Sequence, residues 1–330
     1  MATLIPGAHT IASLPKGFAA AEILASDPIT PRVRLLTLAL DPALLDELEP
    51  GSHLELLLPL GDAGEVRHYS ICEVTPAGCR IAVLREDAGR GGSAWLHTEA
   101  AIGAAIPVRG PRNTFRFSPD HPAQFIAGGI GITPLLTMIG AAERAGTDWQ
   151  LLYLGRSASD MAFLELLREY GERVTVWASE ERGRADLALV FRELPAATHV
   201  YACGPEGLHT ALTALAEAHG AELTLEDFSA GGEGSPVADS GDTQPFTVEL
   251  ADGSEVAVPA GCSILEALGA AGIRTLSSCK RGTCGTCETP IIAGRADHRD
   301  SVLSPEEQAA NETMMICVSR AADERIVLDI

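Results

Sequence analysis

The hydrophobic positions of residues 1–118 fall into short runs separated by turn-forming residues. Five of these runs read PRVRLLTLAL, HLELLLPL, EVRHYSICEV, CRIAVLRE and AAIPVRGP. Short runs that are rich in aliphatic residues and bounded by Gly, Pro or Asp are typical of strands joined by turns. The pattern therefore predicts an antiparallel β-barrel over residues 1–118.

From residue 119 to residue 228, apolar strands alternate with helical segments. AQFIAGG, WQLLYLGRS, RVTVWASE and THVYACGP read as strands, and the first runs through a glycine-rich turn into the helical segment ITPLLTMIGAAERAG. Strands that alternate with helices form parallel sheets, because each crossover helix returns the chain to the same edge. Residues 119–228 are therefore predicted to form a doubly wound α/β domain.

Residues 229–244, SAGGEGSPVADSGDTQ, contain almost no apolar side chains. This composition is typical of a flexible linker, and it predicts that a protease cleaves there under native conditions. Residues 245–330 then read as a separate domain. We expect a β-hairpin around the Asp252–Gly253 turn, a helix from Ser263 and a final strand in IVLDI.

Four of the eight cysteines share a recognisable spacing in this last domain. Cys279, Cys284 and Cys287 are arranged as C-x4-C-x2-C, and Cys317 follows in MMICVSRA. This is the plant-type ligand spacing of a [2Fe–2S] cluster. The glycines and small residues of the loop allow close wrapping of the backbone and leave amides free to point at sulfur. The sequence therefore predicts a β-grasp domain that holds such a cluster.

A structural zinc site is the alternative reading of the cysteine loop. Zinc sites usually show two C-x2-C pairs, and only one such pair is present. Disulfides are disfavoured in a cytoplasmic chain. Cys262 lies outside the ligand spacing and is expected to be a small buried residue.

Composition and charge exclude several classes of protein. The chain has 330 residues, 46% of them hydrophobic, and a formal net charge of −21, as expected for an acidic globular protein of two or three domains. Nucleic acid is excluded as a partner, because phosphate binding needs a basic surface. No apolar run is long enough to cross a bilayer and no signal peptide is evident, so we expect a cytoplasmic location. The charge either maintains solubility or steers a basic protein partner.

Two motifs of the α/β domain indicate a nucleotide site. In GGIGITP, the glycines would let a pyrophosphate reach a helix N-terminus, with Thr133 as N-cap and Pro134 as first helical residue. In YACGP, residues 203–205 stand at the C-terminal end of a later strand, where open α/β sheets bind ligands. A bare structural turn is the alternative for the first motif taken alone.

Two motifs of the barrel carry less information on their own. RHYS places Arg67 and Tyr69 on one face of a strand and Ser70 on the other, unless the strand bends there. GRGGS, residues 89–93, precedes a predicted helix in a way that suits a phosphate group. An arginine on a strand is usually just solvated, and a tyrosine usually packs.

RHYS, GRGGS, GGIGITP, YACGP and C-x4-C-x2-C…C, in this order, resemble the phthalate dioxygenase reductase family. These proteins are the reductases of two-component Rieske oxygenases, and the resemblance spans nearly the whole chain. The C-terminal position of the iron–sulfur domain resembles the FMN-containing branch. The related benzoate dioxygenase reductases carry this domain at the N-terminus and use FAD.

The resemblance implies a set of site residues. FMN is expected to contact Arg67, His68, Tyr69, Ser70, Ala82, Val83, Leu84, Gly91, Gly92, Ser93 and Phe228. The pyridine nucleotide is expected at Gly129, Gly131, Thr133, Pro134, Arg156, Cys203, Gly204 and Pro205. Ser70, near flavin N5, and Cys203, near the nicotinamide, are the expected catalytic residues, and the four cysteines of the spacing hold the metal.

One position departs from a strong NAD site. Arg156 and Ser157 stand where an acidic residue often binds the ribose 2′-hydroxyl, and an arginine there could accommodate the 2′-phosphate of NADPH. Asp160 follows but is out of register. Because the family mostly uses NADH, NADH is the expected donor.

The resemblance also implies the reaction. Hydride passes from NADH to FMN, and electrons then pass one at a time through the [2Fe–2S] cluster to a Rieske-type terminal oxygenase. His298 and Arg299 match a family stretch beside the cluster loop and are expected to help present the cluster to the oxygenase. A haem-thiolate monooxygenase as acceptor and a flavin-less electron carrier are the alternatives. The family is usually monomeric.

Overall fold

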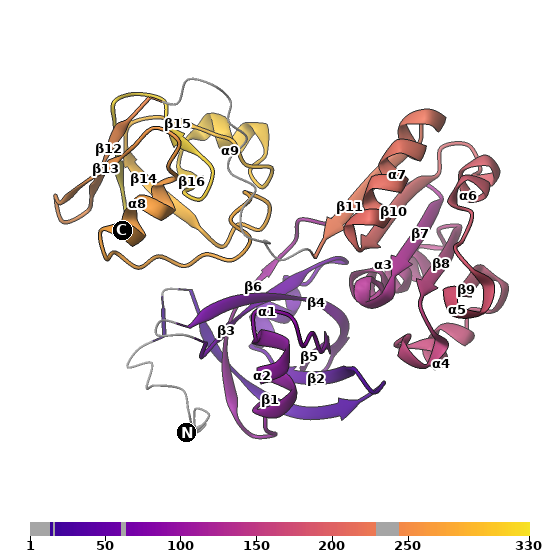
Figure 1. Ribbon diagram of the computed structural model, residues 1–330. Coiled ribbons are helices and arrows are strands. Elements are labelled where there is room, and N and C mark those ends of the chain that lie inside the picture. The colour runs from indigo at the N-terminus through magenta and orange to yellow at the C-terminus, as the bar shows by residue number, and fades with distance from the viewer. Residues whose placement is uncertain (1–13, 16, 61–63, 229–243) are drawn as a thin grey trace. The chain divides into compact units, whose positions relative to one another are not determined.

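A computed structural model describes residues 14–15, 17–60, 64–228 and 244–330. The chain divides into two compact units, one with the barrel and the α/β sheet and one with the C-terminal domain (Figure 1). The linker predicted at residues 229–244, and the protease site within it, lie outside the described residues except for residue 244. No helix in the described part of the chain is long and apolar enough to cross a membrane.

The N-terminal region is a closed antiparallel barrel, as predicted. Its six strands run in the order β1-β2-β5-β4-β3-β6 and comprise β1 (Ala19–Pro28), β2 (Val33–Ala39), β3 (His53–Leu58), β4 (Glu65–Thr75), β5 (Gly78–Leu84) and β6 (Ala105–Arg112). The short helices α1 (Pro42–Asp46) and α2 (Gly92–Thr98) connect them. The sequence pattern predicted only five of the strands. It missed β1 because small alanines fill much of that strand, although Ala21 and Ile23 alternate with exposed positions and enter the barrel core.

The α/β region has a five-stranded sheet in the order β11-β10-β7-β8-β9, with every neighbouring pair parallel. The strands are β7 (Ala123–Gly128), β8 (Trp149–Gly155), β9 (Val174–Ala178), β10 (His199–Gly204) and β11 (Glu222–Asp227). The main helices are α3 (Ile132–Ala145) and α7 (Glu206–His219), with shorter elements η1 (Gly129–Gly131), η2 (Ala158–Asp160), α4 (Leu164–Arg168), η3 (Gly171–Arg173), α5 (Ser179–Arg182) and α6 (Leu187–Glu193). One face of the sheet packs on α3 and on barrel residues, and the other packs on α6 and α7 (Figure 1).

The start of α3 differs from the prediction. The N-cap is Gly131 rather than Thr133, because the 3-10 turn η1 runs directly into the helix. The Thr133 hydroxyl therefore donates back to the Ile130 carbonyl at 3.0 Å instead of accepting from an amide. Pro134 stands at the third helical position, where its missing N–H costs nothing, since the first amides of a helix have no intrahelical partner.

The C-terminal domain has a mixed sheet in the order β13-β12-β18-β14-β16 and a small pair, β15-β17. Its elements are β12 (Phe246–Leu250), β13 (Glu255–Val258), α8 (Ile264–Ala270), β14 (Glu288–Ala293), β15 (Ala296–Asp297), α9 (Pro305–Ala310), β16 (Thr313–Met315), β17 (Arg320–Ala321) and β18 (Arg325–Leu328). The predicted hairpin turns at Gly253, whose φ is +83°. Ser263 caps α8 and forms a capping box with Glu266, as its position at the predicted helix start requires. Cys262 is half-buried against the core.

Candidate functional site

The four cysteines of the C-terminal domain come together as two pairs. All four are buried, with exposed fractions of 4% to 9%. The Cys284 thiol donates to the sulfur of Cys279 and lowers the pKa of Cys279 to about 4, while the same contact raises the pKa of Cys284. Cys287 and Cys317 form the second pair, in which the Cys287 thiol donates and the pKa of Cys317 is lowered. Two thiolates on each of two irons is the ligand arrangement that a binuclear cluster needs.

Backbone amides surround these sulfurs, as the small residues of the loop predicted. The Arg281 amide donates to Cys279 Sγ at 3.4 Å. Amides of Thr283 and Gly282 lower the pKa of Cys279 and Cys317 respectively. The loop achieves this with left-handed residues, including Gly282 at φ +72°. Amide donors stabilise sulfur charge, so the thiols are prepared to bind metal as thiolates.

The geometry does not suit a mononuclear zinc site. Within the ranges that the structure describes, no three His, Cys, Asp or Glu side chains converge as ligands of a single metal ion. The two cysteine pairs are nonetheless adjacent, because Cys279 influences Cys317 and Cys284 influences Cys287 electrostatically. The donor set therefore fits a [2Fe–2S] cluster and not a tetrahedral ion.

In the barrel, Arg67 and the glycines before α2 lie together. The Arg67 guanidinium donates to the Arg90 carbonyl at 3.1 Å. A Cβ on Gly92 would lie 2.8 Å from Arg67 Nε, so only glycine admits this approach. Ser93 accepts a hydrogen bond from the Glu86 amide at 3.0 Å. RHYS and GRGGS, which are distant in the sequence, thus bring an arginine against a glycine turn, a combination that suits a phosphate.

The remaining RHYS residues point in different directions. Tyr69 packs against the barrel core, and burial raises its pKa. Ser70 is only 5% exposed and lies beside Glu226 of β11 in the α/β region. His68 points instead to β3, with Nε2 3.5 Å from Glu55 Oε1 and its ring stacked on His53. The side chain of His68 therefore lies apart from the Ser70 hydroxyl.

Ser70, Cys203 and Glu226 converge from three strands. Cys203 and Glu226 are register partners on the parallel strands β10 and β11. Burial, followed by the charges of Glu226 and Asp227, raises the pKa of the Cys203 thiol. Ser70 Oγ and Glu226 Oε2 are buried, and neither has a well-formed hydrogen bond within the described residues. Buried polar atoms without partners are rare, and these two fit a site where a bound polar molecule supplies the partner.

Glu226 is the functional residue that sequence reasoning missed. An acidic residue on a strand is usually exposed, and LEDF gives no sign that the first acid is buried. Its position two residues before Phe228 was the only available signal. Burial raises the pKa of Glu226 to about 8, against a small opposing effect of the Ser70 hydroxyl. The carboxyl is therefore mostly protonated at neutral pH.

This pKa predicts how the stability of the first unit depends on pH. Between about pH 4.5 and 8 the native chain keeps a proton on Glu226 that the unfolded chain has lost. Stability is therefore greatest below this window, falls as the pH rises through it and levels off above pH 8. Each unit of pKa difference corresponds to about 1.4 kcal/mol. Across this pH window, the free energy of unfolding of Glu226→Gln should therefore fall by several kcal/mol less than that of wild type.

Urea unfolding followed by tryptophan fluorescence measures this effect, since Trp95, Trp149 and Trp177, the chain's only tryptophans, all lie in the first unit. Glu222→Gln, at the exposed start of the same strand, is the matched control and should keep the wild-type pH profile. Parallel profiles of stability against pH for wild type and Glu226→Gln would contradict the raised pKa of Glu226.

The two glycine motifs of the α/β region pack directly on each other. A Cβ on Gly131 would lie 2.2 Å from the Cys203 carbonyl oxygen, and one on Gly204 would lie 3.0 Å from Gly128 Cα. Gly128 in turn leaves room for Pro205, whose Cδ would be 2.8 Å from an added Cβ. The predicted residues Gly129, Gly131, Thr133 and Pro134 are thereby placed beside the Cys203–Gly204–Pro205 motif at the C-terminal edge of the sheet.

Arg156 is not a freely available cation. Its Nε donates to Glu180 Oε1 at 2.8 Å, and the Glu180 amide donates to the Arg156 carbonyl at 3.0 Å. The Arg156 side chain is 81% exposed, so the pair is a surface contact of small energy. An acidic residue nevertheless stands where a 2′-phosphate would approach Arg156.

The other predicted flavin contacts occupy less distinctive places. Ala82, Val83 and Leu84 lie on β5, and the Val83 carbonyl binds His97 Nε2 at 2.8 Å. Phe228 follows β11 and is 37% exposed. A cavity of about 1130 Å³ lies between the barrel and α3, lined in part by Leu35, Cys72 and Thr137, but none of the predicted flavin or nucleotide contacts lines it.

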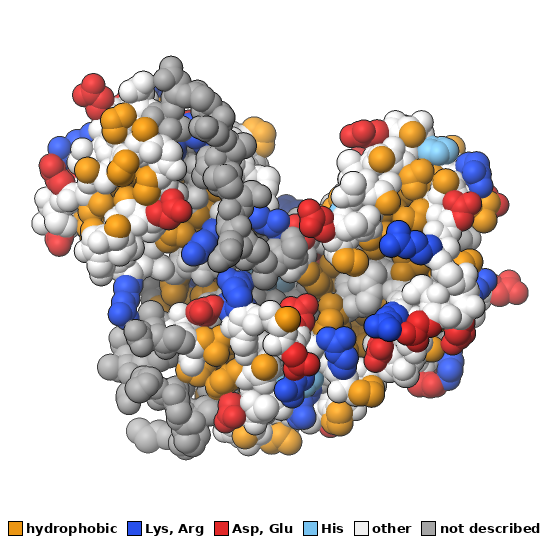
Figure 2. Space-filling view, viewed as in Figure 1, with side chains coloured by type: hydrophobic (Ala, Val, Ile, Leu, Met, Phe, Trp, Pro, Cys, Tyr) orange, Lys and Arg blue, Asp and Glu red, His pale blue; other side chains and the backbone are white. Residues whose placement is uncertain are grey.

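The net charge of −21 is not gathered on one visible area. On the face seen in Figure 2, acidic, basic and hydrophobic side chains are interspersed over the described residues. This face therefore favours the reading that the charge maintains solubility.

Both the nucleotide and the cluster regions match known families. Residues 249–322 match the 2Fe-2S iron-sulfur cluster binding domain, and residues 125–213 match the oxidoreductase NAD-binding domain. The chain is 40% identical over 320 residues to the phenoxybenzoate dioxygenase subunit beta of Ectopseudomonas oleovorans. That alignment covers 92% of this chain and 98% of the relative.

Two solved structures are similar along nearly the whole chain. Phthalate dioxygenase reductase, described as a modular structure for electron transfer from pyridine nucleotides to [2Fe–2S], has a TM-score of 0.63 and 33% identity, covering 95% of this chain and 98% of that one. An intact type IV self-sufficient cytochrome P450 monooxygenase has a TM-score of 0.78 and 39% identity, covering 95% of this chain and 41% of that one. The matches confirm the predicted three-part architecture, and the domain boundaries stay predictions.

Proposed function

The chain belongs to the phthalate dioxygenase reductase family, and from that premise we propose that it uses FMN and NADH and passes electrons to a Rieske-type terminal oxygenase. It is an NAD(P)H-dependent oxidoreductase with a flavin and a [2Fe–2S] cluster, the reductase component of an oxygenase system. The observation that carries the finer proposal is the convergence of Ser70, Cys203 and Glu226 in the same chain as two pairs of cysteine ligands.

FMN is favoured over FAD by two features. The iron–sulfur domain follows the α/β region, as in the FMN-containing branch that the sequence resembles. Arg67 against Gly92 offers a cation and a close backbone approach, which suit the terminal phosphate of a mononucleotide. Extraction of the cofactor and its identification by mass decides between the two flavins.

When bound, the flavin accepts hydride from the nicotinamide and the cluster carries single electrons onward. The residues of the chain orient these groups. Gly131 and Gly204 allow the nucleotide turn to approach the Cys203 backbone, and the buried Cys203 thiol excludes water from that edge. Ser70 would offer its hydroxyl as a donor to a bound flavin, and the Glu226 carboxyl, which burial keeps mostly protonated, would hold a second proton beside Ser70.

An anaerobic titration of the purified protein with NADH tests the proposal. Visible absorption should show flavin and iron–sulfur bands that both bleach. Iron–sulfur bands without flavin bands would instead support the flavin-less carrier. Bands that NADH leaves unbleached would refute the reductase function.

A haem protein is the second candidate acceptor. The observation in its favour is the 39% identity to the corresponding part of a self-sufficient cytochrome P450. Reconstitution separates the two: we expect NADH-driven reduction of a Rieske oxygenase and not of a haem-thiolate monooxygenase. The opposite result would assign the haem partner.

The Arg156–Glu180 pair leads to a prediction about the donor. Glu180 neutralises Arg156 and would repel a 2′-phosphate, so wild type should prefer NADH. Glu180→Gln should raise kcat/KM for NADPH about three- to tenfold and leave kcat/KM for NADH nearly unchanged, since an exposed charge contact is worth about 1 kcal/mol. Glu181→Gln is the control. A wild-type enzyme that prefers NADPH would overturn the NADH proposal.

Arg299 is proposed to contact the oxygenase. Its side chain is 24% exposed and pairs with Asp297 at 2.6 Å. Arg299→Glu should slow electron delivery to the oxygenase and leave NADH–ferricyanide turnover intact. Unchanged delivery would end this proposal. His298 fits such a contact less well, because its side chain is 8% exposed.

A further inference from the structure

The cysteine ligands come from two stretches of chain, and a third segment connects them. This segment comprises residues 298–303 and lies between the loop of Cys279–Cys287 and the stretch around Cys317. The Ser301 amide donates to the Gly282 carbonyl of the cysteine loop at 3.0 Å. On the other side, the Arg299 amide donates to Ser319 Oγ at 3.2 Å. These two contacts therefore attach the segment both to the cysteine loop and to the stretch around Cys317.

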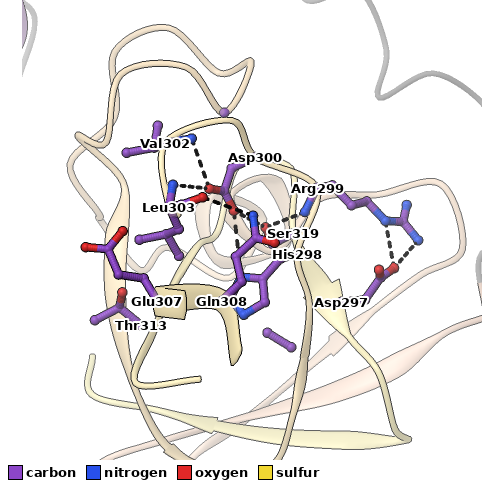
Figure 3. A network of polar contacts seen from close by, with 12 residues as sticks. Asp297, His298, Arg299, Asp300, Val302, Leu303, Glu307, Gln308, Thr313 and Ser319 are labelled. Atoms are coloured by element: carbon purple, nitrogen blue, oxygen red, sulfur yellow. Dashed lines mark hydrogen bonds and ion pairs between the residues drawn. The ribbon is translucent and has the colours of Figure 1, made fainter. Parts of the chain in front are cut away.

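Asp300 is the centre of these contacts (Figure 3). Its Oδ1 accepts from the Ser319 hydroxyl at 3.2 Å. Its Oδ2 accepts from the amides of Val302 at 3.2 Å and Leu303 at 2.9 Å. The side chain has no exposed surface. A fully buried carboxylate is tolerated only when donors satisfy it, and here three donors do so.

The cysteine loop packs against this segment without free space. A Cβ on Gly282 would lie 2.6 Å from Val318 Cγ2 and 3.1 Å from Asp300 Cα. The Gly282 amide also points at the sulfur of Cys317. Asp300 and its neighbours therefore determine how closely the cysteine loop packs on Cys317.

We propose that Asp300 is a positioning residue for the iron–sulfur cluster, because its buried carboxylate connects the Ser319 side chain to the segment that holds the Gly282 loop. This inference rests on the cluster assigned above. The carboxylate fixes the distance between the Cys279–Cys284 pair and the Cys287–Cys317 pair. It also places a negative charge inside the domain, which disfavours the more negative reduced cluster and lowers its reduction potential.

Three variants separate these effects. Asp300→Asn keeps the shape but removes the charge and one acceptor oxygen. Asp300→Ala removes every contact. Ser319→Ala removes the hydroxyl that donates to Asp300 and accepts from the Arg299 amide, and it leaves the two amide contacts of Asp300 in place if the Asp300 variants fold poorly. The matched control is Asp297→Asn, which removes a negative charge just before this segment, where the carboxylate is 44% exposed and pairs with Arg299.

The measurements use the full-length protein and do not depend on turnover. The first is the decay of the visible iron–sulfur bands in the presence of a chelator. Loss of a single hydrogen bond to a buried charge already corresponds to about a tenfold change in an equilibrium, so Asp300→Ala, which loses three, should shorten the half-life by at least about tenfold. Ser319→Ala should shorten it less. The second is the cluster's reduction potential, which should become more positive in Asp300→Asn.

The outcomes are distinct from those of the proposed function. Wild-type protein without iron–sulfur bands would refute the cluster itself. Wild-type bands combined with decay and potential in Asp300→Asn and Ser319→Ala that match Asp297→Asn would refute the role of Asp300. Faster decay with an unchanged potential in Asp300→Asn would overturn the electrostatic part. Faster decay and a more positive potential would support the proposal.

Discussion

Replacing Cys284 by serine should abolish electron delivery to the oxygenase while leaving direct NADH–ferricyanide turnover unchanged. Cys284 is paired with Cys279, so its loss removes one of two thiolates from one iron. Loss of a side chain that only hydrogen-bonds to a metal ligand already lowers metal affinity or activity about 10- to 100-fold, and loss of a ligand itself should cost more. The flavin and nucleotide sites lie in the other compact unit and keep all their residues.

Stopped-flow reduction of the acceptor protein measures delivery, and iron analysis measures retention of the cluster. Cys262→Ser is the matched control, because Cys262 is in the same domain, is half-buried and lies outside the ligand pairs. This control should deliver electrons at the wild-type rate. Wild-type delivery by Cys284→Ser would show that the cluster is not on the electron path.

The ligand set was predictable because its chemistry is local. The spacing of Cys279, Cys284 and Cys287 restricts the metal regardless of the rest of the fold, and the structure adds the pairing. The start of α8 was equally local, since Ser263 and Glu266 form their capping box within one turn. The sequence pattern therefore predicted these features without knowledge of tertiary contacts.

Features that depend on distant contacts were not predictable. Glu226 becomes unusual only because β11 lies beside β10 and Ser70 approaches from the barrel. Asp300 becomes unusual only because Gly282 and Ser319 meet its segment. The N-cap predicted at Thr133 was wrong for a smaller reason. A 3-10 turn, which a pair of glycines permits, runs into α3 and moves its N-cap toward the N-terminus, to Gly131.

Replacing Gly131 by alanine should reduce kcat/KM for NADH–ferricyanide turnover about 100-fold. The added Cβ would lie 2.2 Å from the carbonyl oxygen and 2.5 Å from the carbonyl carbon of Cys203. Both atoms belong to the backbone of β10, so no side-chain rotation relieves the overlap. The glycine turn and the Cys203 motif must separate by about 1 Å, and a misplacement of that size costs about 100-fold in rate.

The separation should act on the nucleotide site and not on folding as a whole. Gly140→Ala is the matched control on the same helix, since its Cβ meets only the flexible Arg144 Nη1 at 3.4 Å. Alanine within a helix is favoured over glycine by about 1 kcal/mol, so this control should be slightly more stable and fully active. If Gly131→Ala kept the wild-type kcat/KM, the turn would tolerate movement and the nucleotide would have to bind elsewhere. Loss of turnover together with unchanged ferredoxin-domain absorption would place the defect at the meeting point of the two glycine motifs.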